Sequence, residues 1–358
     1  MSLNTANRLK RLHQSLAEKE LDGIFISQPE NRYYLSGFDG SAGYLLITPQ
    51  NTILATDFRY IEQVKAQAPG YQIFLISGNV PDWFPELVAE LNLSRLGFEA
   101  GDITFTIYRQ LSETLKKIQS KLKLVPVDGL VESLRAVKET EEIELIARAA
   151  EITDRAFEDI EDMIRVGMTE MEVAWALEKF HREHGSQTLP FDIIVASGPN
   201  SALPHAKPSQ RQIGSGEPIV IDMGARVGGY CSDFTRTLCL GVPDDTFKKV
   251  YDTVLGAQLA AIALIKEGMS GQEADSFART VIAETGYAEA FGHSLGHGIG
   301  LAEHEQPRLG PNSTELLTSG MVFSIEPGIY LPGWGGVRIE DLAVMENGEI
   351  RVLSKGKK

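Results

Sequence analysis

Residues 164–172 read IRVGMTEME, and residues 265–273 read IKEGMSGQE, so one pattern recurs at an offset of 101 positions. In each copy a glycine ends one helical pattern, and a hydroxyl residue followed three positions later by glutamate begins the next. This capping-box pattern is typical of a helix N-terminus. Glu183–Gly185 and Glu284–Gly286 match at the same offset. The repeat predicts a C-terminal region of two similar halves, each with helices followed by strands.

The first part of the chain has a different pattern. Between positions 23 and 127, short apolar runs typical of strands alternate with helical spacing at 58–68, 83–91 and 108–122. No GxGxxG or GxxxxGK[ST] pattern follows these strands, so a nucleotide site has no support. The sequence therefore predicts an α+β chain. Residues 1–128 form an α/β domain with a mixed sheet flanked by helices, and residues 129–358 contain the pseudo-two-fold αβ repeat.

Composition is that of an acidic globular protein. The 358 residues, 43% of them hydrophobic, are enough for two ordinary cores. A net charge of −15 disfavours nucleic acid and anionic membrane as partners. Only Cys231 and Cys239 are present, so we expect no disulfide framework and a cytoplasmic location. The apolar helical stretch 254–265 is too short to span a membrane, and the charged N-terminal segment is unlike a signal peptide.

Four acidic residues interrupt apolar strand patterns. Asp222 lies in IVIDMG, and Asp233 follows it across the glycine-containing turn 226–229, which predicts a hairpin with a strand over 230–240. Glu326 ends MVFSIE, and Glu340 lies in VRIEDLAV. A buried carboxylate is costly unless a cation or a hydrogen-bond donor satisfies it. Each half of the repeat therefore contains two acids that need a partner.

The two acidic pairs are related by the repeat itself. Asp222 and Glu326 are 104 positions apart, and Asp233 and Glu340 are 107 apart, both close to the repeat offset. Four carboxylates meeting at a pseudo-two-fold axis would repel one another, and two divalent ions would cancel their charge. Taken alone, Asp222 and Asp233 are also compatible with two acids near a turn that form salt bridges with partners such as Arg236.

Three histidines lie within the glycine-rich stretch 292–308, which reads GHSLGHGIGLAEHEQPR. Grouping of His293, His297 and His304 favours a functional site over isolated structural histidines. His205 lies 99 positions before His304 and is near-symmetric with it, whereas His297 has no counterpart. His297 is therefore the candidate for a single nitrogen ligand.

The same stretch matches the G-x-S-x-G motif of serine hydrolases at Gly292–Gly296. That motif needs a strand before the serine and a helix after it, and the glycines that follow here disfavour a helix. The hydrolase order also ends on a histidine, yet none follows Asp341. The sequence weighs against a serine hydrolase.

Taken in order, IDMGA, SDFTRT, HSLGHGIGLAEHE, SIEPGIY and VRIED resemble the proline-peptidase branch of the pita-bread metallopeptidases, which includes prolidase and aminopeptidase P. The resemblance covers essentially the whole chain. It implies a creatinase/prolidase-like domain over 1–128 and a pita-bread catalytic domain over 129–358. One departure is Glu303, because the family usually has an apolar Ile or Val before this histidine.

The resemblance implies a dinuclear metallopeptidase that hydrolyses Xaa-Pro dipeptides, with Xaa-Pro aminopeptidase activity on longer peptides as the alternative. Five residues would bind two divalent ions: Asp222, Asp233, His297, Glu326 and Glu340. Mn²⁺ is expected first, and Co²⁺, Zn²⁺ or Fe²⁺ also suit carboxylate and imidazole ligands. Creatinase-like hydrolases and non-catalytic binding relatives share the fold but lack these ligands. The resemblance also implies a homodimer.

Further roles follow from the same resemblance. Glu326 would also transfer a proton from the attacking water to the proline nitrogen. Three histidines would assist: His205 and His304 by binding the substrate carbonyl and the tetrahedral intermediate, and His293 as a nearby proton-transfer residue. Thr235 and Arg338 would orient the ligand carboxylates.

Three more residues are candidates for substrate binding. Phe191 and Ile194 would line a pocket for the proline ring, although two strand core residues are an equally good interpretation. Arg308 would pair with the free carboxylate of a dipeptide, a role that suits a guanidinium group. The alternative for Arg308 is a solvated surface arginine.

Overall fold

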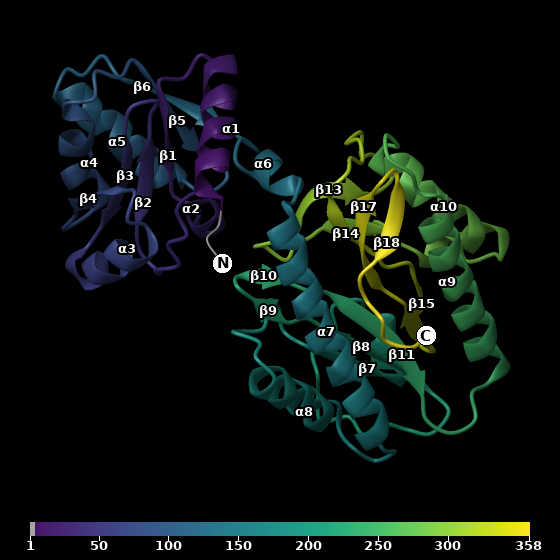
Figure 1. Cartoon of the computed structure of the whole chain (residues 1–358). Coiled ribbons are helices and arrows are strands. Elements are labelled where there is room, and N and C mark those ends of the chain that lie inside the picture. The colour runs from purple at the N-terminus through teal and green to yellow at the C-terminus, as the bar shows by residue number, and fades with distance from the viewer. Residues whose placement is uncertain (1–3) are drawn as a thin grey trace. The chain divides into compact units, whose positions relative to one another are not determined.

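A computed structural model describes residues 4–358, which divide into one compact unit that ends at Leu134 and a second over Arg135–Lys358 (Figure 1). The short helix α6 (Glu132–Ala136) spans the division. Among the described residues, no helix is both long and apolar enough to cross a membrane.

The first unit contains a six-stranded sheet in the order β4-β3-β2-β1-β5-β6. β2 pairs antiparallel with β1 and β3, and the other neighbours are parallel, so the predicted mixed sheet is confirmed. Its strands are β1 (Gly23–Ile26), β2 (Tyr44–Ile47), β3 (Thr52–Thr56), β4 (Gln72–Leu75), β5 (Arg95–Glu99) and β6 (Lys123–Val127).

Helices cover both faces of this sheet. The central strand β1 is therefore buried at every position. Figure 1 shows α4 and α5 on one side of the sheet and α1 on the other. The aromatic ring of Phe25 on β1 packs against Trp83 and Phe84 of α4. The helices are α1 (Thr5–Glu18), α2 (Pro29–Ser36), α3 (Ile61–Gln67) after the 3₁₀ turn η1 (Phe58–Tyr60), α4 (Val80–Ala89) and α5 (Phe105–Lys117).

Helix α2 is a feature that the sequence analysis missed. Its eight residues are too short for a clear periodic pattern. Its ends nevertheless carry recognisable signals, because Pro29 occupies the first turn and Gly37 ends the helix in the left-handed conformation at φ 76°.

The second unit consists of two halves with the same order of α-helices and main strands. The first half has α7 (Thr140–Met163), α8 (Glu170–Glu183), β7 (Ile194–Ser197), η2 (Gly198–Ala202), β8 (Pro218–Met223) and β11 (Phe234–Cys239). The second has α9 (Asp245–Leu264), α10 (Gly271–Glu284), η3 (Ala288–Ala290), β12 (Gly296–Gly298), β14 (Val322–Ile325) and β17 (Asp341–Glu346). The sheets run β11-β8-β7 and β13-β12-β14-β17-β18, so β7, β8 and β11 correspond to β12, β14 and β17.

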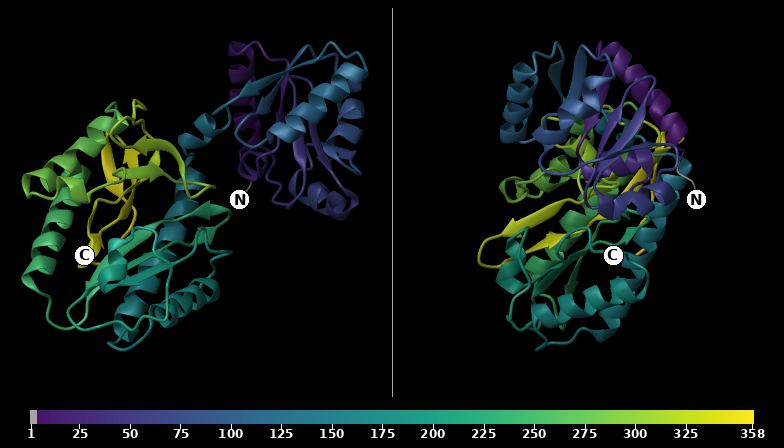
Figure 2. Two further views of the ribbon diagram at one scale, coloured as in Figure 1. Left: turned by 180° about the vertical axis from the view of Figure 1, so that it is seen from behind. Right: turned by 90° about the vertical axis from the view of Figure 1, so that its left-hand side faces the viewer.

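The remaining strands extend these sheets or form small hairpins. They are β9 (Arg226–Val227), β10 (Tyr230–Cys231), β13 (Glu305–Leu309), β15 (Gly328–Leu331), β16 (Gly335–Arg338) and β18 (Glu349–Val352). Seen from behind in Figure 2, the green helices α9 and α10 lie along the strands of the second half, and the teal helices α7 and α8 lie along those of the first.

The helix caps confirm the pseudo-two-fold repeat. The hydroxyls of Thr169 and Ser270 accept hydrogen bonds from the backbone of Glu172 and Glu273, whose carboxylates bond back to the capping residues. Isolated bridges pair Thr169 with Gln212 and Ser270 with Leu316, in the segments before β8 and β14. Both predicted helix starts are therefore in place at the predicted offset.

The predicted hairpin is present, but its second strand is broken. Val227 pairs with Tyr230 across the turn, and the main ladder pairs Asp222 with Thr235. The expected continuous strand over 230–240 is wrong, because residues 232 and 233 leave the ladder. The hydroxyl of Ser232 accepts a hydrogen bond from Ala225 N, which closes this irregular segment. Asp233 therefore comes from the break, immediately before β11.

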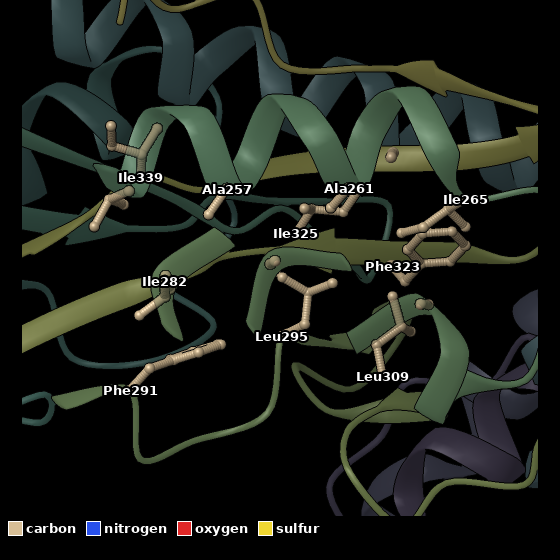
Figure 3. Packing of buried hydrophobic residues seen from close by; sticks show 14 of the residues in the cluster. Ala257, Ala261, Ile265, Ile282, Phe291, Leu295, Leu309, Phe323, Ile325 and Ile339 are labelled. Atoms are coloured by element: carbon tan, nitrogen blue, oxygen red, sulfur yellow. The ribbon is translucent and has the colours of Figure 1, made fainter. Parts of the chain in front are cut away.

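The core of the second half supports the ends of its strands (Figure 3). Ala257 and Ala261 lie on one face of α9 and pack toward Phe323 and Ile325 of β14, all of them buried. Burial of a large apolar side chain stabilises the fold by roughly 1.5–3 kcal/mol. Glu326 is the next residue after this buried strand and is therefore held on a rigid support.

Candidate metal centre

Corresponding elements of the two halves supply four acids to one place. Asp222 lies on β8 and Asp233 precedes β11, while Glu326 follows β14 and Glu340 precedes β17. A ligand atom from each of Asp233, His297 and Glu340 lies within 4.8 Å of the other two. The His297 Nε2 atom is 3.2 Å from Glu326 Oε1 and 3.6 Å from Asp233 Oδ2. Asp222 lines the same cavity as these four side chains.

Burial and repulsion between neighbouring carboxylates raise the pKa of three of the four acids, Asp222, Asp233 and Glu340. Burial raises the pKa of Asp233 well above its usual value, and the carboxylates of Glu340 and Asp222 raise it further. The pKa of Glu340 is also raised well above its usual value, first by burial and then by the carboxylates of Glu326 and Asp222. Like charges in a desolvated site disfavour ionisation unless a cation is present. A bound cation would relieve this repulsion.

Glu326 and His297 behave as a pair within the cluster. Burial would raise the pKa of Glu326, but the hydrogen bond with His297 and the positive charges around the carboxylate, that of His297 first, together outweigh burial and hold it at about 2. Burial would lower the pKa of His297, but the same hydrogen bond and the negative charges of Glu326 and Glu340 together raise it to about 9. Ser324 stabilises this geometry, because its hydroxyl donates to Glu326 Oε1 at 2.9 Å and accepts from His297 N at 3.1 Å. The sequence analysis did not single out Ser324.

The residues fit divalent metal ions. Asp222 Oδ1 and Glu340 Oε1 are buried, and neither has a hydrogen-bond partner within residues 4–358. Buried polar atoms in proteins are normally satisfied, so two orphaned carboxylate oxygens in one cluster call for a cation. Carboxylate oxygens with one imidazole nitrogen are ligands that suit Mn²⁺, Zn²⁺ or Fe²⁺.

The other oxygen of each of these two carboxylates is held by a buried hydrogen-bond chain. The Arg338 guanidinium donates to Asp222 Oδ2 at 2.6 Å and to Thr235 Oγ1 at 3.1 Å. The Thr235 hydroxyl in turn donates to Glu340 Oε2 at 2.7 Å. Fixing one oxygen aims the unpartnered one into the cluster, which is how supporting residues orient metal ligands.

Tyr330 joins this network and was missed by the sequence analysis. Its hydroxyl accepts a hydrogen bond from Arg338 Nη1 at 2.9 Å and lies 3.0 Å from His293 Nε2. His293 Nδ1 lies 2.8 Å from the Ser294 carbonyl, which assigns the ring proton to Nδ1 and makes Nε2 the acceptor from Tyr330. Burial lowers the pKa of His293, which favours this neutral form. A tyrosine in the apolar string GIYL gives no signal of such a role.

A cavity of about 820 Å³ opens onto the cluster. All the sequence-predicted site residues line it except Thr235, which lies behind Glu340. The His304 ring stands 4.2 Å from the His297 ring, centroid to centroid, and both His205 and His304 are exposed. Ile194 pairs with Asp222 in the β7–β8 ladder, which places it on the cavity wall next to the acids.

Arg308 is exposed at the cavity and pairs with His297 in the β12–β13 ladder. Its Nε donates to the Ser294 hydroxyl at 3.1 Å. Strand β12 follows Ser294 where a nucleophile elbow would need a helix, and η3 precedes it where that motif would need a strand. The serine-hydrolase alternative is therefore excluded by the local structure.

Comparison with known proteins places both units in described families. The model of the Creatinase/Prolidase N-terminal domain matches residues 8–137, and the model of metallopeptidase family M24 matches residues 144–347. A Xaa-Pro dipeptidase of Pyrococcus furiosus is 37% identical over 96% of this chain and 97% of its own length.

Two solved structures are similar over nearly the whole chain. A structure described as Xaa-Pro dipeptidase from Bacillus anthracis has a TM-score of 0.95 and 43% identity, and covers 99% of both chains. That of an X-Pro aminopeptidase from Thermotoga maritima has a TM-score of 0.86 and 38% identity, and covers 96% of this chain and 98% of its own. The predicted fold and family resemblance are thereby confirmed.

Proposed function

This chain belongs to metallopeptidase family M24, and from that premise we propose that it hydrolyses Xaa-Pro dipeptides at a centre of two divalent metal ions. One observation carries the proposal. Asp222 and Glu340 each have one oxygen fixed by a protein donor and the other buried without a partner in residues 4–358, within a cluster of four acids and His297. The names of two similar proteins as Xaa-Pro dipeptidases support the substrate class.

Five residues would hold the two ions: Asp222, Asp233, His297, Glu326 and Glu340. When bound, divalent ions polarise a scissile carbonyl and lower the pKa of water. Mn²⁺ is our first choice of metal, and the carboxylate-rich ligand set supports it. We also propose a homodimer in the cytoplasm, which the family resemblance and the two free cysteines support.

Residues of the chain itself would transfer protons and position the substrate. Glu326, steadied by the Ser324 hydroxyl, would accept the proton of the attacking water and deliver it to the proline nitrogen as the peptide bond breaks. His205 and His304 at the cavity would donate hydrogen bonds to the substrate carbonyl and to the tetrahedral intermediate. His293, neutral and bound to Tyr330, would act as a nearby proton-transfer residue.

The substrate's proline end needs an apolar wall and a cation. Phe191 and Ile194 line the cavity and would contact the ring. Arg308 would bind the free carboxylate, which in a dipeptide belongs to the proline itself.

The second candidate function is an Xaa-Pro aminopeptidase that acts on longer peptides. The cavity of about 820 Å³ favours it, because ligand pockets of roughly 300–1,000 Å³ hold molecules larger than a dipeptide. The similar Thermotoga maritima protein also carries an aminopeptidase name.

The two functions are distinguished by the substrate. The Mn²⁺-loaded protein should hydrolyse Ala-Pro with a higher kcat/KM than Ala-Pro-Ala, and should leave Ala-Ala intact. A higher kcat/KM for Ala-Pro-Ala would establish the aminopeptidase instead, and cleavage of Ala-Ala at a similar rate would contradict proline specificity altogether.

A further inference from the structure

The cavity wall carries acidic groups besides those of the metal cluster. Glu303 lines the cavity, directly before His304. The side chain is 40% exposed, so its carboxylate reaches the cavity solvent rather than the protein core. None of the roles described above uses this carboxylate.

Glu303 and Glu305 flank His304, but their side chains differ in burial and in ionic partners. Glu305 is buried, forms ion pairs with Arg135 and Lys138, and accepts a hydrogen bond from Ala302 N at 3.0 Å. Its negative charge is therefore compensated by the fold.

Glu303 has no comparable compensation. Its nearest ionic partner in residues 4–358 is His304, whose Nδ1 lies 3.6 Å from Glu303 Oε1. That distance exceeds a normal hydrogen bond. The Glu303 carboxylate consequently remains available to a cation that enters the cavity.

The proposed function leaves two parts of a dipeptide unassigned: the N-terminal amine, which every substrate carries, and the side chain before proline. The ring and carboxylate of the proline are assigned to Phe191, Ile194 and Arg308, and the scissile carbonyl to His205 and His304. The side chain of the residue before proline is the remaining group whose charge varies from one substrate to another. Only Lys or Arg at that position would bring a long, flexible cationic group to the wall.

We propose that Glu303 gives the enzyme a preference for Xaa-Pro substrates in which the residue before proline is Lys or Arg. This inference rests on the proposed function, because it concerns the same cavity and the same reaction. A partly exposed ion pair is worth on the order of a fivefold change in kcat/KM, and it weakens as salt screens the charges.

The test compares substrates of similar length and different charge. The kcat/KM ratio of Lys-Pro to Met-Pro is measured for the wild-type protein and for Glu303→Gln, both loaded with Mn²⁺. We expect the ratio to exceed one in the wild type and to fall about fivefold in Glu303→Gln. Rising ionic strength should lower the wild-type ratio toward that of the variant.

Two further variants test whether the effect depends on the charge of Glu303 itself. Glu303→Lys should invert the preference, so that Glu-Pro is cleaved better than Gln-Pro. Asp192→Asn, which removes another carboxylate of the same cavity wall, should keep the wild-type ratio.

The outcomes separate this inference from the proposed function. Hydrolysis with an unchanged ratio in Glu303→Gln, or an equal fall in Asp192→Asn, would overturn the role of Glu303 and leave the proposed function intact. A wild-type protein that cleaves no Xaa-Pro dipeptide would overturn both.

Discussion

Arg338 and Asp222 form a buried ion pair in which Nη2 lies 2.6 Å from Oδ2, while the Oδ1 atom of the same carboxylate has no hydrogen-bond partner in residues 4–358. The arginine therefore does not neutralise the cluster. It fixes the rotation of the Asp222 carboxylate and leaves one oxygen available to a metal ion. The same guanidinium also contacts Thr235 and Tyr330, so one side chain aligns several parts of the site.

Replacement of this arginine should weaken metal binding. In Arg338→Gln the Asp222 carboxylate loses its charged donor, and we expect metal affinity to fall by about 10- to 100-fold. Isothermal titration with Mn²⁺ measures the change. Arg351→Gln removes an exposed pair with Glu346 and serves as the control. Equal affinity in the two variants would contradict the orienting role of Arg338.

The buried ion pairs of Glu305 with Arg135 and Lys138 should make the free energy of unfolding depend on pH in the acid range. Burial would raise the pKa of Glu305, but Lys138 and Arg135 hold it at about 2, below the ordinary value of 4.5. Because the folded-state pKa is lowered, the stabilisation is fully present above about pH 4.5 and is lost as the pH falls toward 2.

Glu305→Gln should reduce this dependence and leave two buried cations unpaired, which costs roughly 3–5 kcal/mol of unfolding free energy at neutral pH. Denaturant unfolding across the acid range measures both effects. Glu346→Gln, which breaks only an exposed pair, should cost at most about 1 kcal/mol. A neutral-pH cost in Glu305→Gln no larger than that of the control would contradict the account.

Arg308 decides between the two candidate substrates. If it binds the free carboxylate of proline, Arg308→Ala should lower kcat/KM on Ala-Pro about 10- to 150-fold, the equivalent of a lost charged hydrogen bond. The fall on Ala-Pro-Ala should be much smaller, because its carboxylate lies one residue farther away. An equal fall on both peptides, or none on either, would remove the argument for a dipeptidase.

The sequence predicted the parts of the fold that have strong local signals. Capping boxes at Thr169 and Ser270 fix helix starts through bonds between residues three positions apart, so the repeat was visible before the structure. The acids within apolar strands could also be recognised from the sequence, because burial of a charge is costly wherever the strand lies in the fold.

The missed features depend on contacts between distant segments. Tyr330 meets Arg338 only because β15 and β16 pair as a hairpin, and it meets His293 across the fold. Ser324 lies in an apolar strand that gives no hint of its bond to Glu326. The break at Asp233 depends on a hydrogen bond from Ala225 to Ser232, which strand alternation does not encode.

The central claim is that four carboxylates and His297 bind two divalent ions, and metal content measures it most directly. Protein stripped by a chelator is dialysed against Mn²⁺ and analysed by elemental mass spectrometry, for the wild type, for Asp233→Asn and for the cavity-wall control Asp192→Asn. The account predicts about two ions per chain in the wild type and the control, and one or fewer in Asp233→Asn. Two ions per chain in Asp233→Asn, or none in the wild type, would contradict it.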